Sequence, residues 1–489
     1  MMTKKNLLLT GCLLSPLFIA SGGNASSESS QRPHIILIMA DDMGWGDVGF
    51  NGNKMIKTPV LDALAVEGVR MDHFYSAGPL SSPTRASVLT GRNPFRTGVF
   101  SANEGILRPE EVTLPELLRD AGYRTGHFGK WHLGTLTYQE KDANRGCPEN
   151  KHLYNPPLLH GYDDAFVTES KVPTYDPMRK PFHCDGRFWD YLAEGDAALP
   201  YGTFYWNIRG TKVTDRLQGD DSRIIIDHAL PFMEEAIDNE LPFFSVVWFH
   251  APHMPCVAGP EHAALYPDCS LEERNYYGCI TAMDEQIGRL VDFLKSKGAY
   301  EHTIFLFCSD NGPELNTPGS AGSFRGKKRS LYEGGIRVPA FMVWKEKIAS
   351  PKVMTEPCFT SDYLPSLLDI LDLKKPEGVR LDGESFWPLV MGKSVVRSKP
   401  LVFCSERQGA VIQGQHKLYY SEGTYELYDL MNDPMEQHNI AAKDPVITET
   451  LTKIWMEQMA SYEHSFRGDE YGTRSYEKVP QQWHDVTNK

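Results

Sequence analysis

Ser81 opens a short stretch, Ser81–Arg92, whose residue types suit chemistry on an anionic ester. Ser82 is a good helix N-cap and Pro83 suits the first helical position, so we expect Ser81 at the N-terminus of a short helix. Backbone N–H groups and the dipole at that end attract anions. Arg85, one turn later, should point to the same place with a guanidinium that binds two oxygens. The stretch offers a nucleophile beside an anion site, although an ordinary capped helix has the same pattern.

Further polar and charged residues lie where other predicted strands end. They are Asp41, Asp42, Lys130, His132, His253, Asp310 and Asn311. Open α/β sheets bind ligands at the carboxyl ends of their strands. A single such pair would be an ordinary turn, since Asp and Asn favour turns. Together with the Ser81 stretch, however, the pattern occurs at four strand ends, and His253 follows a fifth. We therefore expect these residues to share one site.

Several of these side chains present only oxygen to a metal. This set is typical of a hard cation such as calcium or magnesium rather than zinc, and comprises Asp41, Asp42, Asp310 and Asn311. The nine cysteines contain no CxxC pair and no zinc-ligand spacing, which argues against a cysteine-type metal site. Their spacing defines no disulfide pairing.

Strands and helices alternate around these residues. Continuous apolar runs at 34–40, 242–249 and 303–308 are typical of strands buried on both faces. Capping boxes begin predicted helices after Thr113 and Ser270. The alternation predicts an α/β fold with a large, mostly parallel central sheet flanked by helices.

The pattern changes after about residue 395. Short strands are predicted at 401–404, 410–413, 417–420 and 426–428. A single helix is predicted after them, at 446–462. At 489 residues the chain is long enough for two domains. We therefore expect a catalytic domain over 32–394 and a smaller C-terminal α+β domain over 395–489.

Residues 140–220 are rich in Pro, Gly, Asp and aromatic residues and show little regular period. So long a loop region is usually functional, and we expect it to form a wall of the substrate pocket; surface decoration is the alternative. Its aromatic side chains could stack on sugar rings, although such residues more often belong to a core. They are Tyr154, Tyr162, Tyr175, Trp189, Tyr205 and Trp206.

Charge limits the possible partners. The chain has 64 acidic and 50 basic residues, a net charge of −14 with His neutral. This balance argues against non-specific nucleic-acid binding, which needs a basic surface. A local cluster of Lys, Arg and metal can still attract an anionic substrate.

The N-terminus is typical of an export signal. Two lysines precede an apolar run over residues 7–20, which is too short to anchor the chain across a bilayer. We expect a signal peptide over 1–22, a disordered leader over 23–31 and a periplasmic protein without an integral membrane segment. Leu9–Cys12 resembles a lipoprotein box, so outer-membrane anchoring at Cys12 is the alternative.

The stretch Ser81-x-Pro83-Thr84-Arg85, followed after six residues by Arg92, resembles the signature of the type I sulfatases of the alkaline-phosphatase superfamily. Other family-like motifs occur in the expected order over about residues 33–465: Met39–Gly44, Gly129–Gly134, Ala251–His253, Ser309–Gly312, Gly326–Pro339 and Glu426–Pro434. The resemblance implies an alkaline-phosphatase-like fold and hydrolysis of O-sulfate esters on carbohydrates. We expect a galactose or N-acetylgalactosamine sulfate as the substrate.

The resemblance also implies how the nucleophile is made. A maturase would oxidise Ser81 to formylglycine (3-oxoalanine), and one hydroxyl of the hydrated aldehyde would attack sulfur. One calcium ion would be bound by Asp41, Asp42, Asp310, Asn311 and the modified Ser81. An unmodified serine would remain trapped as the sulfate ester.

The same resemblance assigns the remaining charges. Arg85, Lys130 and Lys328 would neutralise the sulfate oxygens. His132 would deprotonate the second hydroxyl to expel sulfate, and His253 would protonate the leaving sugar oxygen. Motif spacing favours Lys328 over Lys327 and His253 over His250.

One position departs from the commonest family pattern. The family usually has Cys where Ser81 stands, so the chain is either a serine-type sulfatase or carries a Cys-to-Ser replacement. Phosphatases of the superfamily have His in place of Asn311 for a two-zinc site, so Asn311 favours one hard cation. Two alternatives stay open: a phosphate or phosphonate ester hydrolase, and a non-catalytic sulfated-glycan-binding protein in which Ser81 is never oxidised.

Overall fold

The computed structural model describes residues 32–182, 189–192, 196, 198–348 and 351–471. The predicted signal peptide at 1–22, the leader at 23–31 and Cys12 lie outside the described residues, as do positions 472–489 of the predicted C-terminal domain. Within the described ranges, no helix combines the length and apolar character needed to cross a membrane. The seven cysteines described there are free.

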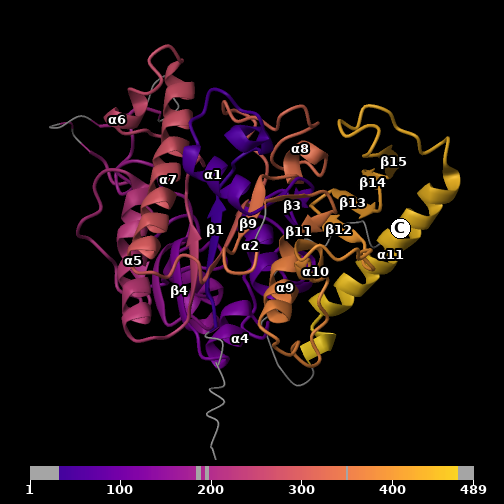
Figure 1. Cartoon of the computed structure of the whole chain (residues 1–489), viewed down its shortest axis with the longest axis horizontal. Coiled ribbons are helices and arrows are strands. Elements are labelled where there is room, and N and C mark those ends of the chain that lie inside the picture. Colours follow the sequence, from indigo (N-terminus) through magenta and orange to yellow (C-terminus); the bar gives the residue numbers. More distant parts are fainter. Residues whose placement is uncertain (1–31, 183–188, 193–195, 197, 349–350, 472–489) are drawn as a thin grey trace, which may run out of the picture. The chain divides into compact units, whose positions relative to one another are not determined.

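A large, mostly parallel sheet forms the centre of the fold (Figure 1). Within the described residues its nine strands lie in the order β10 (Lys352–Met354), β2 (Val69–Met71), β9 (Ala340–Val343), β8 (Thr303–Ser309), β1 (His34–Ala40), β7 (Phe243–Trp248), β4 (Arg124–Lys130), β5 (Asp164–Thr168) and β6 (Tyr205–Asn207). β9 and β6 pair antiparallel to their neighbours. The predicted α/β fold is confirmed.

β1 is the middle strand, and its sequence explains why. All seven of its residues are buried, and burying an apolar side chain such as Ile36 or Leu37 stabilises the fold by about 1.5–3 kcal/mol. The strand runs parallel to β8 and β7, with Ala40 opposite Ser309 and Met39 opposite Trp248. The residues that follow these three strands therefore meet at one edge of the sheet.

Helices cover both faces of the sheet. Alternate side chains of β1 pack with α1 (Pro59–Glu67), α5 (Asp221–Asp238) and α7 (Leu271–Ser296) on one face. The opposite face packs with α2 (Ser81–Thr90), α4 (Leu114–Asp120) and α9 (Tyr363–Ile370). The shorter helices are α3 (Pro94–Thr97), α6 (Pro260–Ala263), α8 (Glu333–Ile336) and α10 (Trp387–Val390).

The predicted caps of two helices are present. Thr113 and Glu116 form a capping box before α4, and Ser270 and Glu273 form another before α7. Asp72 and His73 form a turn between β2 and the two-residue strand β3 (Phe74–Tyr75). β3 pairs with β11 (Cys358–Phe359), outside the central sheet.

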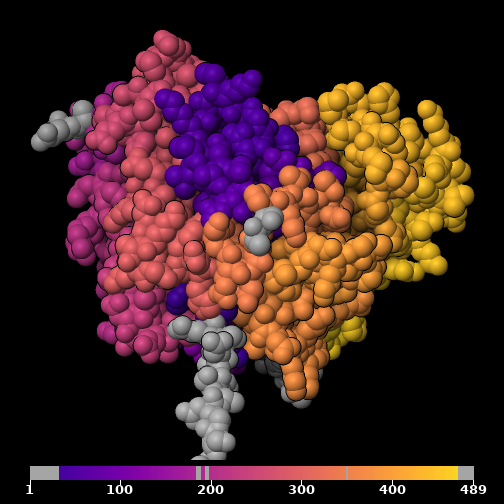
Figure 2. Space-filling model, in the orientation of Figure 1, coloured from indigo at the N-terminus to yellow at the C-terminus, as the bar shows by residue number. Residues whose placement is uncertain are grey.

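The C-terminal part forms a small antiparallel sheet with one long helix. The strands are β12 (Leu401–Cys404), β13 (Gln408–Gln413), β14 (His416–Ser421) and β15 (Thr424–Asp429), and the helix is α11 (Pro445–Phe466). Phe95 and Phe100 pack with Trp455 of α11, so this sheet shares a hydrophobic cluster with earlier parts of the chain. In the space-filling view, the yellow C-terminal surface is continuous with the orange segment that precedes it (Figure 2).

Buried charge also links the C-terminal sheet to α8. Lys417 of β14 is fully buried, and its Nζ lies 2.9 Å from Glu333 Oε1 and 2.8 Å from Glu436 Oε1. The backbone N–H of Glu333 donates to Glu436 Oε2 over 2.6 Å. These contacts fix the start of α8, which follows Lys328 by five residues.

Candidate active site

The strand ends bring the predicted site residues together, as the topology requires. Asp41 and Asp42 follow β1, Asp310 and Asn311 follow β8, and Lys130 ends β4. These five side chains are buried, as are Ser81, Arg85, His132 and Lys328, whereas His253 retains 13% side-chain exposure. A buried group of so many charges needs internal partners, because isolated charges are costly to bury.

Ser81 lies at the N-terminus of α2 and faces this group. Helix α2 begins at Ser81 itself and Leu80 is the N-cap, so the prediction that Ser82 caps the helix was wrong. The hydroxyl of Ser82 instead donates to the backbone carbonyl of His132 over 2.7 Å. Ser81 Oγ donates to Asp41 Oδ1 over 3.0 Å and accepts from Lys130 Nζ over 3.2 Å. The side chain thus sits between a carboxylate and an ammonium group.

The acidic residues form a compact oxygen-rich cluster. The backbone N–H of Asp42 donates to Asp310 Oδ1 over 3.0 Å, and Asn311 Nδ2 donates to Asp42 Oδ1 over 2.7 Å. Asn311 Oδ1 is buried and has no hydrogen-bond partner within the described residues. Burial and the adjacent Asp41 carboxylate raise the pKa of Asp310 to about 7. An orphaned acceptor among crowded carboxylates fits a hard cation.

His253 lies close to two of these carboxylates, and its ring nitrogen is a third potential metal ligand. One potential ligand atom from each of Asp41, Asp42 and His253 lies within 4.8 Å of the others. His253 Nδ1 donates to the carbonyl of Met254 over 2.7 Å, and its Nε2 lies 3.5 Å from Asp42 Oδ2. Burial lowers the pKa of His253 to about 3. The imidazole is therefore neutral and directs Nε2 into the site.

Each of the three predicted sulfate-binding cations is paired with a different carboxylate. Lys130 Nζ lies 2.6 Å from Asp41 Oδ2, Arg85 Nη2 lies 3.1 Å from Asp310 Oδ2, and Lys328 Nζ lies 2.7 Å from Asp42 Oδ2. Burial alone would raise the pKa of Asp41, but these cations together with His253 hold it well below its ordinary value. With all three carboxylates ionised, three positive and three negative charges balance, so a divalent cation would make the site net positive for an anionic ester.

His132 is held in one tautomer by Asn103. His132 Nε2 lies 3.1 Å from Asn103 Oδ1, which also accepts from Asn144 Nδ2 over 3.0 Å. Because a carbonyl oxygen only accepts, Nε2 carries the proton and Nδ1 keeps a lone pair. Nδ1 is buried without a partner among the described residues. Burial, Lys130 and Arg145 lower the pKa of His132 well below its ordinary value, so the ring is neutral.

The neighbouring candidates occupy other places. His250 is fully buried between Asp221 Oδ2, 2.8 Å from Nδ1, and Thr168 Oγ1, 2.7 Å from Nε2. Lys327 donates to the carbonyl of Gly319 over 2.8 Å, whereas Lys328 reaches the acidic cluster. The structure thus brings Lys328 and His253, rather than Lys327 and His250, to Asp42 in the acidic cluster.

Sequence patterns did not identify Asn103 or Lys171. Asn103 has a φ of 66°, a left-handed conformation that Asn tolerates, but nothing near it in the sequence announces a contact with His132. Lys171 follows β5 by three residues. Four of the six aromatic residues proposed as sugar-stacking candidates are buried in hydrophobic clusters: Tyr162, Trp189, Tyr205 and Trp206. Tyr154 and Tyr175 are half-buried.

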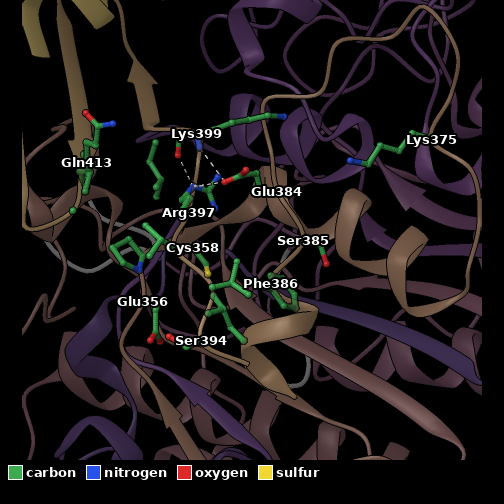
Figure 3. Close-up of a pocket in the computed structure, with 17 residues that line it drawn as sticks. Glu356, Cys358, Lys375, Glu384, Ser385, Phe386, Ser394, Arg397, Lys399 and Gln413 are labelled. Atoms are coloured by element: carbon green, nitrogen blue, oxygen red, sulfur yellow. Dashed lines mark hydrogen bonds and ion pairs between the residues drawn. The ribbon is translucent and has the colours of Figure 1, made fainter. Parts of the chain in front are cut away.

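A cavity of about 480 Å³ lies elsewhere, between residues 356–401 and β13 (Figure 3). Two of the basic groups that line it have partners: Arg397 binds both carboxylate oxygens of Asp362, and Lys399 Nζ donates to the carbonyl of Leu381 over 2.7 Å. None of the predicted site residues lines it. The reactive groups of the chain are therefore at the strand ends and not in this cavity.

Comparisons with known proteins agree with this location. Residues 33–373 match the family model described as Sulfatase, and residues 319–464 match the model described as N-sulphoglucosamine sulphohydrolase, C-terminal. The first match includes every residue placed in the cluster above. The second extends through the small antiparallel sheet into α11.

Individual relatives are similar over most of the chain. N-acetylgalactosamine-6-sulfatase of Mus musculus is 31% identical over 82% of this chain and 75% of that protein. Arylsulfatase A of Homo sapiens is 31% identical over 87% of each chain. A solved structure of Ps i-CgsB in complex with k-i-k-neocarrahexaose aligns with a TM-score of 0.74 and 26% identity, covering 89% of this chain and 93% of that one. With its buried serine, acidic cluster and three cations, the chain belongs to the sulfatase family and is a sulfuric ester hydrolase.

Proposed function

We propose that the protein hydrolyses O-sulfate esters on carbohydrates, using formylglycine made from Ser81 and one calcium ion. The observation that carries this proposal is the position of Ser81 Oγ, 3.0 Å from Asp41 Oδ1 and 3.2 Å from Lys130 Nζ at the start of a buried helix. We propose a galactose or N-acetylgalactosamine sulfate as substrate, and the name of the mouse relative supports the second of these.

Conversion of Ser81 to formylglycine removes two hydrogen atoms, which the maturase passes to an electron acceptor. The hydrated aldehyde supplies two hydroxyl groups on one carbon, so that one can form the sulfate ester and the other can release it. The chain's contribution is position: helix α2 fixes the side chain, and Asp41 accepts a hydrogen bond from its hydroxyl. The N-terminal N–H groups of α2 favour an anion at the same place.

Calcium, when bound by Asp41, Asp42, Asp310, Asn311 and the modified Ser81, would neutralise carboxylate charge and polarise a sulfate oxygen. The oxygen-only donor set and the unpartnered Asn311 Oδ1 support this choice. Arg85, Lys130 and Lys328 direct their charges into the same space from three different elements. Sulfate oxygens placed there meet a preorganised set of donors.

Two histidines are placed to move protons. His132 offers an unprotonated Nδ1, because its Nε2–H is directed to Asn103, and can accept the proton of the second hydroxyl. His253 uses Nδ1–H to bind the carbonyl of Met254, so a proton gained by the ring is held at Nε2. The negative charge of a bound sulfate ester and of Asp42 acts against the effect of burial on the pKa of His253, and a proton held at Nε2 can pass to the leaving sugar oxygen.

The decisive experiment co-expresses the chain with a serine-type maturase and measures sulfate release from N-acetylgalactosamine 6-sulfate and galactose 6-sulfate. We expect release from at least one sugar, one calcium per chain and a Ser81 peptide lighter by two hydrogens. Two zinc ions per chain with faster phosphate-ester hydrolysis would establish the phosphoesterase alternative. An unmodified Ser81 peptide with sugar binding but no turnover would establish the binding-protein alternative.

We also propose export to the periplasm. Residues 1–22 have the charge and apolar pattern of a signal peptide, and Cys12 offers the alternative of a lipid anchor. N-terminal sequencing of the mature protein after cell fractionation tests this. A chain that begins near residue 23 supports cleavage, whereas a lipidated Cys12 in the membrane fraction supports anchoring.

A further inference from the structure

Lys171 lies on the segment 168–174. One end of this segment contacts the part of the site around His132, and the other end contacts the part around His253. This segment begins at the end of β5, where Thr168 is the register partner of Lys130. The carbonyl of Glu169 accepts from the backbone N–H of His132 over 2.9 Å. At the other end, the backbone N–H of Thr174 donates to the carbonyl of Pro255, two residues after His253, over 3.2 Å. Lys171 is thus bracketed by the His132 and His253 sides.

The backbone around Lys171 is firmly held. Thr168 Oγ1 donates to the carbonyl of Ser170 over 2.6 Å, and the same hydroxyl contacts His250 Nε2 at 2.7 Å. Thr174 Oγ1 donates to the carbonyl of Val257 over 2.7 Å. Ser170 and Val172, the two neighbours of Lys171, are both buried. The position of the lysine relative to the strand ends is therefore set by the fold rather than by a loose loop.

The ammonium group of Lys171 has no partner. Within the part of the chain that the structure describes, it makes no hydrogen bond and no ion pair, although the residue is half-buried. Arg85, Lys130 and Lys328 are all paired, so Lys171 differs from the other cations at the site. Burial and the nearby Lys328 lower the pKa of Lys171, and Asp42, Asp41 and Glu314 act in the opposite direction. A half-buried cation without a partner is suited to an anion from outside.

The neighbours of Lys171 indicate which part of a substrate it meets. The charges that act on it most are those of Lys328 and Asp42, and His253 Nε2 is 3.5 Å from the same Asp42. With Thr174 bonded to the carbonyl of Pro255, this associates Lys171 with the His253 side of the site, where the leaving sugar oxygen is proposed to be protonated. The scissile sulfate already has three cations of its own.

We propose that Lys171 binds a second anionic group, a carboxylate or a further sulfate, on the sugar portion of the substrate. This inference rests on the proposed function, and it narrows the substrate class to polyanionic glycans rather than singly charged sugar sulfates. A charge-assisted hydrogen bond of this kind corresponds to a preference of about 10- to 100-fold.

The test compares Lys171→Met with the wild type on N-acetylgalactosamine 6-sulfate, on its 4,6-disulfate, and on the 6-sulfate linked to glucuronate. For each enzyme we take the ratio of kcat/KM for a doubly charged substrate to kcat/KM for the singly charged one. We expect Lys171→Met to lower this ratio about 10- to 100-fold, mainly through KM. The substrate that shows the drop identifies the group as sulfate or carboxylate.

Lys180→Met is the matched control, because Lys180 is an exposed lysine nine residues along the same irregular region. It should leave the ratio unchanged. Calorimetric titration of the same three sugars measures binding without turnover and keeps the test independent of sulfatase activity. If the wild type binds the doubly charged sugars but releases no sulfate, the proposed function fails while the role of Lys171 is still measured.

Two outcomes would overturn the inference. The first is an unchanged ratio, in both kinetics and binding, in Lys171→Met. The second is an equal loss of kcat on all three substrates, which would show that Lys171 acts on the scissile sulfate itself.

Discussion

Two buried groups of charges in this molecule differ in one respect. At the strand ends, Asn311 Oδ1, His132 Nδ1 and Arg85 Nε have no partner among the described residues. Beneath α11, Arg96 has every nitrogen occupied: it binds both carboxylate oxygens of Asp382, at 2.8 and 3.0 Å, and Ser465 Oγ at 2.6 Å. Both groups are largely buried, so burial alone does not distinguish a site from a structural support.

The two groups differ in whether all of their polar atoms have hydrogen-bond partners. Asp382 also accepts the backbone N–H of Asn93 over 2.6 Å, so both members of the Arg96 pair are satisfied by protein atoms. The strand-end group balances its charges but leaves donors and acceptors unused, which costs folding free energy unless a ligand supplies the missing contacts. Each substitution below tests whether the first group serves chemistry and the second serves stability.

Ser81→Ala should have the largest effect on activity. Because the nucleophile precursor is removed, we expect sulfate release to fall by about 10⁴-fold or more. Thermal unfolding should change little, since only the contacts to Asp41 and Lys130 are lost. The matched control is Ser87→Ala on the same helix, whose hydroxyl donates to the carbonyl of Thr84 over 2.7 Å. Retained sulfate release in Ser81→Ala would contradict the assignment.

Calcium should complete the strand-end group. Chelation should abolish sulfate release, and calcium at 100 times its Kd should stabilise the fold by about 2.7 kcal/mol. Asn311→Leu should reduce this calcium-dependent rise in Tm, because it removes an oxygen ligand. A Tm that does not respond to calcium, or that responds to zinc with two ions bound, would contradict the proposed metal.

Asp382→Asn should show the reverse pattern. It leaves the buried Arg96 without a charged partner, so we expect a loss of about 3–5 kcal/mol in the free energy of unfolding. At 25 °C the folded variant should keep its kcat. The exposed pair Glu463–Arg467 provides the control, since Glu463→Gln should cost less than about 1 kcal/mol. An unstable variant that also changes the pH dependence of kcat would contradict the assignment of the Arg96–Asp382 pair to stability alone.

Asn103→Leu should affect catalysis more than stability. Without the acceptor for Nε2–H, His132 loses its fixed tautomer, and we expect kcat to fall by about 10- to 100-fold with little change in KM. Asn144→Leu removes only the second hydrogen bond to Asn103 Oδ1, so its effect should be smaller. Equal losses in both variants would show that the loop, and not the tautomer, matters.

The Arg96–Asp382 pair should also give the smallest effect, a pH dependence of stability. Burial would raise the pKa of Asp382, but Arg96 holds it below its ordinary value. A depressed carboxyl pKa contributes stability above about pH 3.9 and loses it as pH falls through the lower, folded pKa. The stability gap between wild type and Asp382→Asn should therefore be constant from pH 7 to 5 and shrink below pH 4 in urea titrations. A gap that widens on acidification would contradict this.

Much of this site could be predicted from sequence because strand ends are easy to recognise. The apolar run of β1 ends in Asp41 and Asp42, and that of β8 ends in Asp310 and Asn311, so parallel pairing alone brings these residues together. Motif spacing also separated Lys328 from Lys327. These inferences depend on short sequence patterns: an apolar run that ends in polar residues, and the spacing of residues within one motif.

Other contacts depend on loop conformations that leave no local pattern. Asn103 reaches His132 across 29 positions, and Lys171 is placed by hydrogen bonds from both of its flanks. The start of α2 was misplaced for a similar reason, because the Ser82 hydroxyl binds the carbonyl of His132 rather than capping its own helix. Tertiary contacts, rather than local sequence, set the positions of Asn103 and Lys171 and the start of α2.

The buried contact between Lys417 and Glu333 also affects when the site can be completed during synthesis of the chain. Lys328 belongs to a segment whose end is fixed by residues made roughly 90 to 110 positions later, at Lys417 and Glu436. During synthesis, the strands that carry Asp41, Lys130 and Asp310 are all complete before this last support exists. The strand-end group therefore becomes complete only when nearly the entire chain has emerged, and a protein cut short before β14 would lack the support of its Lys328 segment.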